Sequence, residues 1–222
     1  GESTLRTEDI LDYINIEGEE IALIMLGGVN YYTGQLFDMQ KITEKAHQYD
    51  CIVGFDLAHA CGNIHLNLHE WDVDFAAWCG YKYLNGGPGA PSGVFINERF
   101  LKDSNINRFE GWWGHDKSSR FKMPLNFKPI VTAEAWQLSN PPILSMAALL
   151  ASLKIFKNAG MKNLVSKSNL LTSYLEFLIL EKLNKHIQII TPNKPNERGC
   201  QLSIKLKKPI KNITNILYKS GI

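Results

Sequence analysis

Hydrophobic and polar positions in the first part of the chain follow two alternating patterns. Residues 7–16 repeat apolar side chains with the period of an amphipathic helix, for which Thr7 is the expected N-cap. Residues 21–26 form an unbroken apolar run, which predicts a fully buried strand. A second helix is expected to begin after its N-cap Asp38 and to extend to about Tyr49.

Shorter apolar runs predict further strands at residues 51–55, 74–79 and 93–96. Turns or short helices are expected between residues 60 and 71. A strand, a helix and a strand in this order predict parallel pairing through a right-handed crossover. We therefore expect an α/β fold built on a mainly parallel sheet.

An irregular stretch between residues 105 and 140 interrupts these patterns. It mixes aromatic and polar side chains, most densely at residues 111–115 and again at residues 120–121. Long irregular segments inside compact domains are usually functional or disordered, and the aromatic content argues against disorder. We expect this stretch to form a wall of a functional site or to contact a partner subunit.

Two long helices are predicted after this stretch, at residues 143–158 and 161–183. Two alternating strands and a last helix follow, at residues 187–190, 201–204 and 210–219. The predicted organisation therefore has three parts. These are part of a large domain at residues 1–142, linking helices at 143–184 and part of a small α+β domain at 185–222.

Composition limits the classes of protein that fit. The 222 residues are 45% hydrophobic and 21% charged with a net charge of +2, which suits a globular protein and gives no support for a nucleic-acid partner. No apolar run has the length of a membrane span and no signal peptide is recognisable, so we expect a cytoplasmic protein. Both ends are expected to continue in a longer protein.

The four cysteines form no CxxC pair, so neither a zinc ribbon nor a redox dithiol is supported. We expect them to be buried thiols in a reducing compartment. They are Cys51, Cys61, Cys79 and Cys200.

The candidate chemistry lies where two predicted strands end. Lys82 stands between Tyr81 and Tyr83 at the mouth of a glycine-rich turn, directly after one strand. Asp56 and His59 follow the strand before it. In open α/β sheets, ligands bind in the crevice beyond the carboxyl ends of the strands. The sequence therefore predicts a site that combines an amine, a carboxylate and an imidazole.

Each of these residues also has an ordinary structural interpretation. Asp56 is suited to cap a helix, His59 to be a hydrogen-bonded buried histidine, and Lys82 to lie along the surface with its charge in water. Their combination favours catalysis, because a lysine in a cleft forms Schiff bases, most often with pyridoxal phosphate, whose ring nitrogen needs a carboxylate. Candidate phosphate donors are Tyr81, Trp112 and backbone amides near Gly27 and Gly86.

The motifs together resemble the kynureninase family of pyridoxal-phosphate hydrolases, in the class V aminotransferase group of the fold type I superfamily. The resemblance runs in order over nearly the whole chain and implies the large and small domains of that fold. Its motifs are DLAH at 56–59, WDVDFA at 71–76, YKYLN at 81–85, GWWGH at 111–115, RFKM at 120–123, SNPP at 139–142 and ERGCQL at 197–202.

The resemblance implies a role for each matching residue. Lys82 would hold the cofactor and move protons, Asp56 would pair with the ring nitrogen, and His59 would contact the ring or its phenolic oxygen. Tyr81 would bond to the phosphate and assist proton transfer. Trp112 and Asn140 would reach the cofactor or substrate, in part across a homodimer interface. Several relatives have a polar side chain where Gly27 stands, so only a backbone amide could serve the phosphate there.

The implied reaction is hydrolysis of the Cβ–Cγ bond of L-kynurenine, or of its 3-hydroxy form, to L-alanine and an anthranilate. This reaction belongs to tryptophan degradation and NAD biosynthesis. The remaining cofactor and substrate contacts of the family lie in segments outside this sequence.

Three alternatives stay open at this point. A cysteine desulfurase shares the fold and the lysine but characteristically has a histidine where Tyr81 stands. A truncated, cofactor-free relative could act as a binding or structural subunit. A metal site could use Asp56, His59, Cys61 and His65, although their spacing fits no common structural zinc site.

Overall fold

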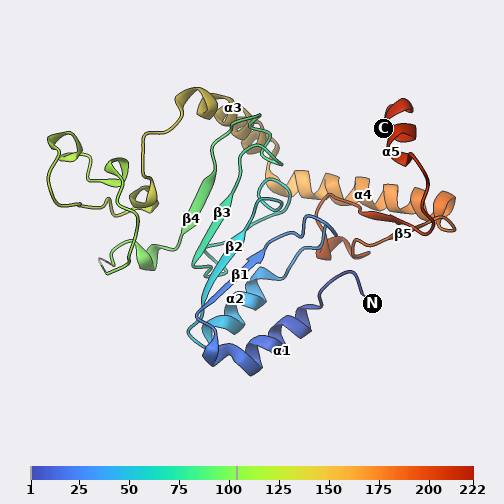
Figure 1. Ribbon diagram of the computed structural model, residues 1–222, viewed down its shortest axis with the longest axis horizontal. Coiled ribbons are helices and arrows are strands. Elements are labelled where there is room, and N and C mark those ends of the chain that lie inside the picture. The colour runs from blue at the N-terminus through green and yellow to red at the C-terminus, as the bar shows by residue number, and fades with distance from the viewer. Residues whose placement is uncertain (1, 104) are drawn as a thin grey trace.

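A four-stranded sheet forms the centre of the computed structural model, which describes residues 2–103 and 105–222 (Figure 1). The strands lie in chain order as β1 (Leu23–Gly27), β2 (Ile52–Asp56), β3 (Phe75–Trp78) and β4 (Gly93–Ile96). The first three are parallel, and β4 runs antiparallel to β3. The mainly parallel α/β sheet expected from the sequence is confirmed.

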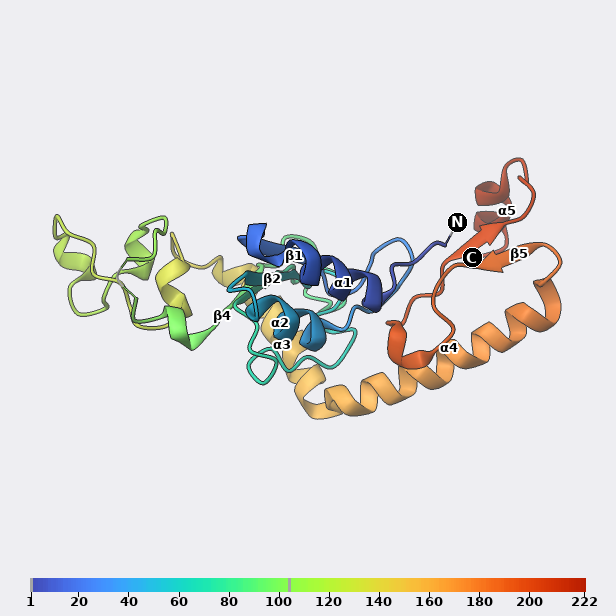
Figure 2. The same ribbon diagram turned by 90° about the horizontal axis from the view of Figure 1, so that it is seen from below.

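Two helices, α1 (Thr7–Glu17) and α2 (Met39–His47), pack together beside the sheet (Figures 1 and 2). Asp38 caps α2 as predicted, because its side chain accepts a 3.1 Å hydrogen bond from the Lys41 amide. The predicted cap of α1 is wrong. Arg6 occupies the N-cap position, where its side chain makes no capping hydrogen bond, and Thr7 is the first helical residue.

The fully buried strand predicted at residues 21–26 is also wrong. Leu23 and Met25 of β1 are 51% and 48% exposed, whereas Ile24 between them lies in the core. The alternation arises because successive side chains of a strand point to opposite faces of the sheet, and the face that carries Leu23 and Met25 is largely uncovered in the described residues. β1 and α1 line an apolar groove of about 450 Å³.

A buried carboxylate fastens the ends of the strands that lie away from the predicted site. Asp74 directly precedes β3, and its side chain is 2% exposed. It accepts a 2.7 Å hydrogen bond from the Val53 amide and contacts His47 Nε2 at 2.9 Å and the Arg99 guanidinium. Asp74 thereby fixes the start of β2 to the start of β3.

The second half of the chain extends from the sheet on both sides (Figure 1). Residues 105–142, which we call the aromatic lobe, project beyond β4. The helices α3 (Ile143–Ala159) and α4 (Met161–Leu183) then lead to a two-stranded antiparallel sheet and a last helix. These are β5 (Ile187–Ile189), β6 (Ile204–Leu206) and α5 (Ile213–Lys219).

Short 3₁₀ helices account for much of the remaining regular structure. They lie at Gly18–Glu20, Glu98–Phe100, Trp112–Gly114, Arg120–Lys122, Ala133–Trp136 and Pro195–Glu197. The strand predicted at residues 201–204 is displaced, since β6 begins only at Ile204.

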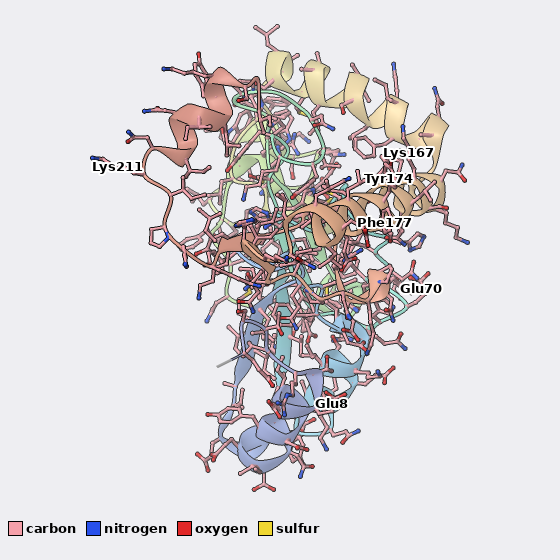
Figure 3. The ribbon with its side chains drawn as sticks, turned by 90° about the vertical axis from the view of Figure 1, so that its right-hand side faces the viewer. Glu8, Glu70, Lys167, Tyr174, Phe177 and Lys211 are labelled. Carbon is pink, nitrogen blue, oxygen red and sulfur yellow. The ribbon has the colours of Figure 1, made fainter. Side chains whose placement is uncertain are left out.

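The long helices carry many exposed apolar side chains. Tyr174 and Phe177 of α4, labelled in Figure 3, are 60% and 55% exposed. No residue of α3 is buried. Within the described residues no single helix is long and apolar enough to cross a membrane, and α3 and α4 pass that test only as a pair bent by 80°.

The expectation of four buried thiols holds only for Cys51. Cys61 and Cys79 are half-buried, and Cys200 is exposed, although all four are free thiols. Burial, followed by the nearby Cys79, raises the pKa of Cys61 to about 11.

Candidate active site

The structure brings Lys82 and His59 together at the edge of the sheet where β2 and β3 end. Lys82 Nζ lies 3.0 Å from His59 Nε2. Because β2 and β3 are parallel neighbours, the loops that follow them leave the sheet on the same side. The amine and the imidazole therefore meet where the strand pattern placed them.

Two aromatic rings lie beside His59. The ring centroids of Tyr31 and Tyr83 lie 6.2 Å and 5.9 Å from that of His59. Burial is the main cause that lowers the pKa of His59, and the Lys82 charge lowers it further, while Asp56 acts in the opposite sense. A neutral imidazole that accepts a hydrogen bond from Lys82 at Nε2 carries its proton on Nδ1, and this buried atom has no hydrogen-bond partner.

Two cavities meet at His59. The larger, which we call the lysine cavity, has a volume of about 710 Å³ and is lined by Lys82, Tyr83 and apolar residues of α3 such as Phe156. The smaller, the carboxylate cavity, has a volume of about 330 Å³ and is lined by Gly27, Tyr31 and Asp56, among others. His59 lines both, so it stands between the amine and the carboxylate.

Asp56 ends β2 and is exposed. Its Oδ1 accepts a 2.8 Å hydrogen bond from the Ala58 amide, which fixes the turn that leads to His59. The carboxylate therefore caps a turn and not a helix. The bond to the Ala58 amide uses only Oδ1 of the carboxylate, and Asp56 also lines the carboxylate cavity.

Two adjacent glycines at the end of β1 differ in the space around them. A Cβ added at Gly27 would meet no atom closer than 3.7 Å, whereas one added at Gly28 would lie 2.7 Å from Leu57 Cδ2 and 3.0 Å from Ala60 Cβ. Gly28 is therefore required by close packing against the turn after β2. Gly27 leaves room for a side chain at the wall of the carboxylate cavity.

Three of the predicted site residues are not gathered here. Tyr81 is 55% exposed and lines neither cavity. Trp112 and Asn140 lie in the aromatic lobe, beyond β4, and also line neither cavity. Within one copy, the described structure thus brings Lys82 and His59 together with Gly27 and Asp56 on the adjoining cavity, whereas the other three line neither cavity.

The aromatic lobe has its own internal support. The Arg120 guanidinium lies 4.1 Å above the Trp113 ring and donates to the carbonyls of Trp113 and His115. Trp112 packs edge-on against Trp113 and Phe121, with centroids 5.3 Å and 5.8 Å away, and is 43% exposed. The lobe therefore presents the Trp112 ring at its surface.

Sequence reasoning did not single out Tyr31 or Asn63. Tyr31 lies in the loop after β1, and the glycines of that loop are a pattern by which the sequence could have indicated a site there. Asn63 lies four residues beyond His59 and donates to its carbonyl at 2.9 Å. No sequence pattern marks it, because its importance depends on what it meets in space.

Among residues 2–103 and 105–222, no group of three or more His, Cys, Asp or Glu side chains could hold a metal ion. The alternative set of Asp56, His59, Cys61 and His65 falls within that range.

Comparison with known sequences gives one consistent family. Residues 2–222 match the model of the family described as aminotransferase class-V. The chain is similar to kynureninases of Koribacter versatilis and Myxococcus xanthus, with 55% and 53% identity over 100% of the chain and 52% of each relative. A kynureninase of the sea anemone Nematostella vectensis is 46% identical and is covered over 50% of its length. The chain thus spans about half the length of the curated relatives it matches.

Comparison with solved structures identifies the fold alone. An apo cysteine desulfurase from Thermococcus onnurineus aligns with a TM-score of 0.74 at 17% identity, over 100% of this chain and 52% of that one. A C-DES mutant with glycine covalently linked to its PLP cofactor gives 0.76 at 18%, over 100% of this chain and 56% of that one. The match of residues 2–222 to the family model shows that the chain belongs to the aminotransferase class-V family.

Proposed function

We propose that the chain is part of a kynureninase-type hydrolase, which splits the Cβ–Cγ bond of L-kynurenine or 3-hydroxy-L-kynurenine into L-alanine and an anthranilate. The observation that carries the proposal is the 3.0 Å contact between Lys82 and His59 at the ends of two parallel strands. The identity of 55% and 53% to kynureninases supports the choice of reaction over the desulfurase alternative.

The residues around His59 fit pyridoxal phosphate. The carboxylate cavity measures about 330 Å³. The buried His59 Nδ1 has no hydrogen-bond partner within the chain, and a bound ligand could supply one. In the proposed holoenzyme Lys82 holds the cofactor covalently, Asp56 pairs with its ring nitrogen, and His59 lies against the ring or its phenolic oxygen. The Gly27 amide and Tyr81 are the proposed phosphate contacts. When bound, pyridoxal phosphate supplies an electron sink for the substrate.

The chain's own groups move and hold protons around that sink. Lys82 Nζ is the proposed carrier, because an amine beside a cleft can release and return a proton at the substrate. His59 has a lowered pKa, so its neutral Nε2 accepts a hydrogen bond from Lys82 and keeps the amine oriented. Tyr83 and Tyr31 place their rings beside the His59 member of this pair.

A second copy of the chain completes the proposed site. Trp112 and Asn140 line neither cavity at Lys82 and His59 in their own copy, while the aromatic lobe presents Trp112 at its surface. In the proposed cytoplasmic homodimer, each lobe reaches the Lys82 site of its partner. We also propose the division at residues 142 and 184 between the large domain, the linking helices and the small domain.

The test uses the full-length protein supplied with pyridoxal phosphate and L-kynurenine, with anthranilate followed by its fluorescence. Borohydride reduction and peptide mapping should place the cofactor on Lys82. Lys82→Ala should lose at least about 10³-fold in turnover, whereas Lys205→Ala, an exposed lysine of β6, should stay within about 2-fold. A full-length protein that neither links the cofactor nor releases anthranilate would refute the proposal and favour the cofactor-free binding subunit.

A further inference from the structure

A short C-terminal segment lies across the loops that carry the candidate site. Residues 198–203, which we call the C-terminal seam, bond to the loop after β1 and to the turn after β2. The bonds to the loop join Gly199 N to Gly34 O at 3.1 Å, Gln201 Nε2 to Tyr31 O at 2.9 Å and Ser203 Oγ to Tyr32 O at 2.5 Å. The seam therefore ties together the loop after β1 and the turn after β2, which supply Tyr31 and His59 to the lining of the carboxylate cavity.

One buried side chain connects the seam to His59. Asn63 Oδ1 accepts a 2.9 Å hydrogen bond from the Cys200 amide, 137 positions away in sequence, and Asn63 Nδ2 donates to the His59 carbonyl at 2.9 Å. Asn63 is only 7% exposed. Because its oxygen and its nitrogen each hold a different segment, the amide has a single productive orientation.

Gly199 preserves the space that this amide needs. A Cβ added at Gly199 would lie 2.5 Å from Asn63 Nδ2 and 3.0 Å from both Cγ and Oδ1. Such a contact forces a shift, and the atoms that would move are the end of the Asn63 side chain and not backbone. A methyl group at Gly199 would therefore displace the amide while leaving the fold largely intact.

We propose that Asn63, held in place by the Gly199–Cys200 backbone, is a positioning residue that fixes His59 against Lys82. The inference rests on the proposed function, which assigns His59 and Lys82 to the cofactor site. Asn63 acts through the backbone of His59, whose side chain spans the two cavities and meets Lys82 Nζ at 3.0 Å. A shift of that backbone changes the amine–imidazole geometry directly.

The test compares Gly199→Ala, Asn63→Ala and the double variant in full-length holoenzyme. Each single variant should lower kcat about 10- to 100-fold with KM within about 2-fold, since displacement of a positioned group by about 1 Å has that effect. In the double variant the methyl group at residue 199 has no Asn63 amide to displace. The kcat of the double variant should therefore be close to that of Asn63→Ala, and not lowered by the product of the two single effects. Ser203→Ala removes a seam contact that does not touch Asn63 and should stay within about 2-fold.

A second readout does not depend on turnover. Amide hydrogen exchange in the apoprotein should become faster at residues 57–64 in Gly199→Ala, at least about 10-fold, while β1 and β2 keep their protection. Unchanged exchange together with near-normal kcat in both single variants would overturn the proposal, as would independent effects in the double variant. If the unsubstituted protein proves inactive, the proposed function fails, and the exchange result alone still decides whether Asn63 holds His59.

Discussion

The buried carboxylate of Asp74 offers the sharpest prediction about stability. In Asp74→Ala, the amide of the fully buried Val53 loses its 2.7 Å partner, and His47 and Arg99 lose their contacts with Asp74 but keep those with Asp72. An unpaired buried amide costs about 1–3 kcal/mol. The lost charged contacts add about 1–2 kcal/mol after allowance for the 36% exposure of the Arg99 side chain. The whole effect is therefore about 2–5 kcal/mol, close to that of breaking a buried ion pair.

A matched pair of variants separates the two contributions. Asp74→Asn keeps an oxygen for the Val53 amide but removes the charge, so it should cost only about 1–2 kcal/mol. Calorimetric melting of the apoprotein should show a lower Tm for both variants, by about 4–20 °C for Ala and about 2–8 °C for Asn. Glu181→Ala, an exposed change on α4, should stay within about 0.5 kcal/mol. Equal melting of the Ala and Asn variants would show that the amide does not depend on this carboxylate.

Two further predictions concern the residues that surround the carboxylate cavity. Gly28→Ala should lower the Tm of the apoprotein by several degrees because its Cβ would lie 2.7 Å from Leu57 Cδ2, whereas Gly27→Ala should leave it nearly unchanged; equal Tm values would contradict the packing argument. The lowered pKa of His59 means that the unfolded chain binds a proton more readily than the folded one, so stability should fall as pH drops through the ordinary histidine value of about 6.5. Replacement by His59→Gln should flatten the dependence of Tm on pH in that window, and an identical slope in both proteins would refute this assignment.

The sequence predicted most reliably those elements whose ends depend on local signals. α4 occupies the predicted residues because Gly160, with a φ of +77°, ends one helix just before the next begins. The strand predicted at residues 201–204 fails for a tertiary reason. Gln201 and Ser203 bond to Tyr31 and Tyr32 in the loop after β1. An apolar alternation cannot reveal such partners.

In the candidate site, too, some features follow from the local sequence and others depend on contacts between distant segments. The meeting of Lys82 with His59 follows from parallel strands that end at one edge, a rule available from sequence. Asn63 could not be found in this way, because its bond to Cys200 joins positions far apart in the chain. Motif resemblance predicts Trp112 and Asn140 as site residues, but only the structure shows that the segment 105–142, which contains them, projects beyond β4.

The proposed homodimer has a genetic consequence, because Lys82 and Trp112 of one site would come from different chains. A chain that lacks Lys82 and a chain that lacks Trp112 would each be defective alone. In a mixed dimer, the intact Lys82 of the second chain would meet the intact Trp112 of the first, so one complete site would form. Defects in the two regions would therefore behave as separate complementation groups within a single gene.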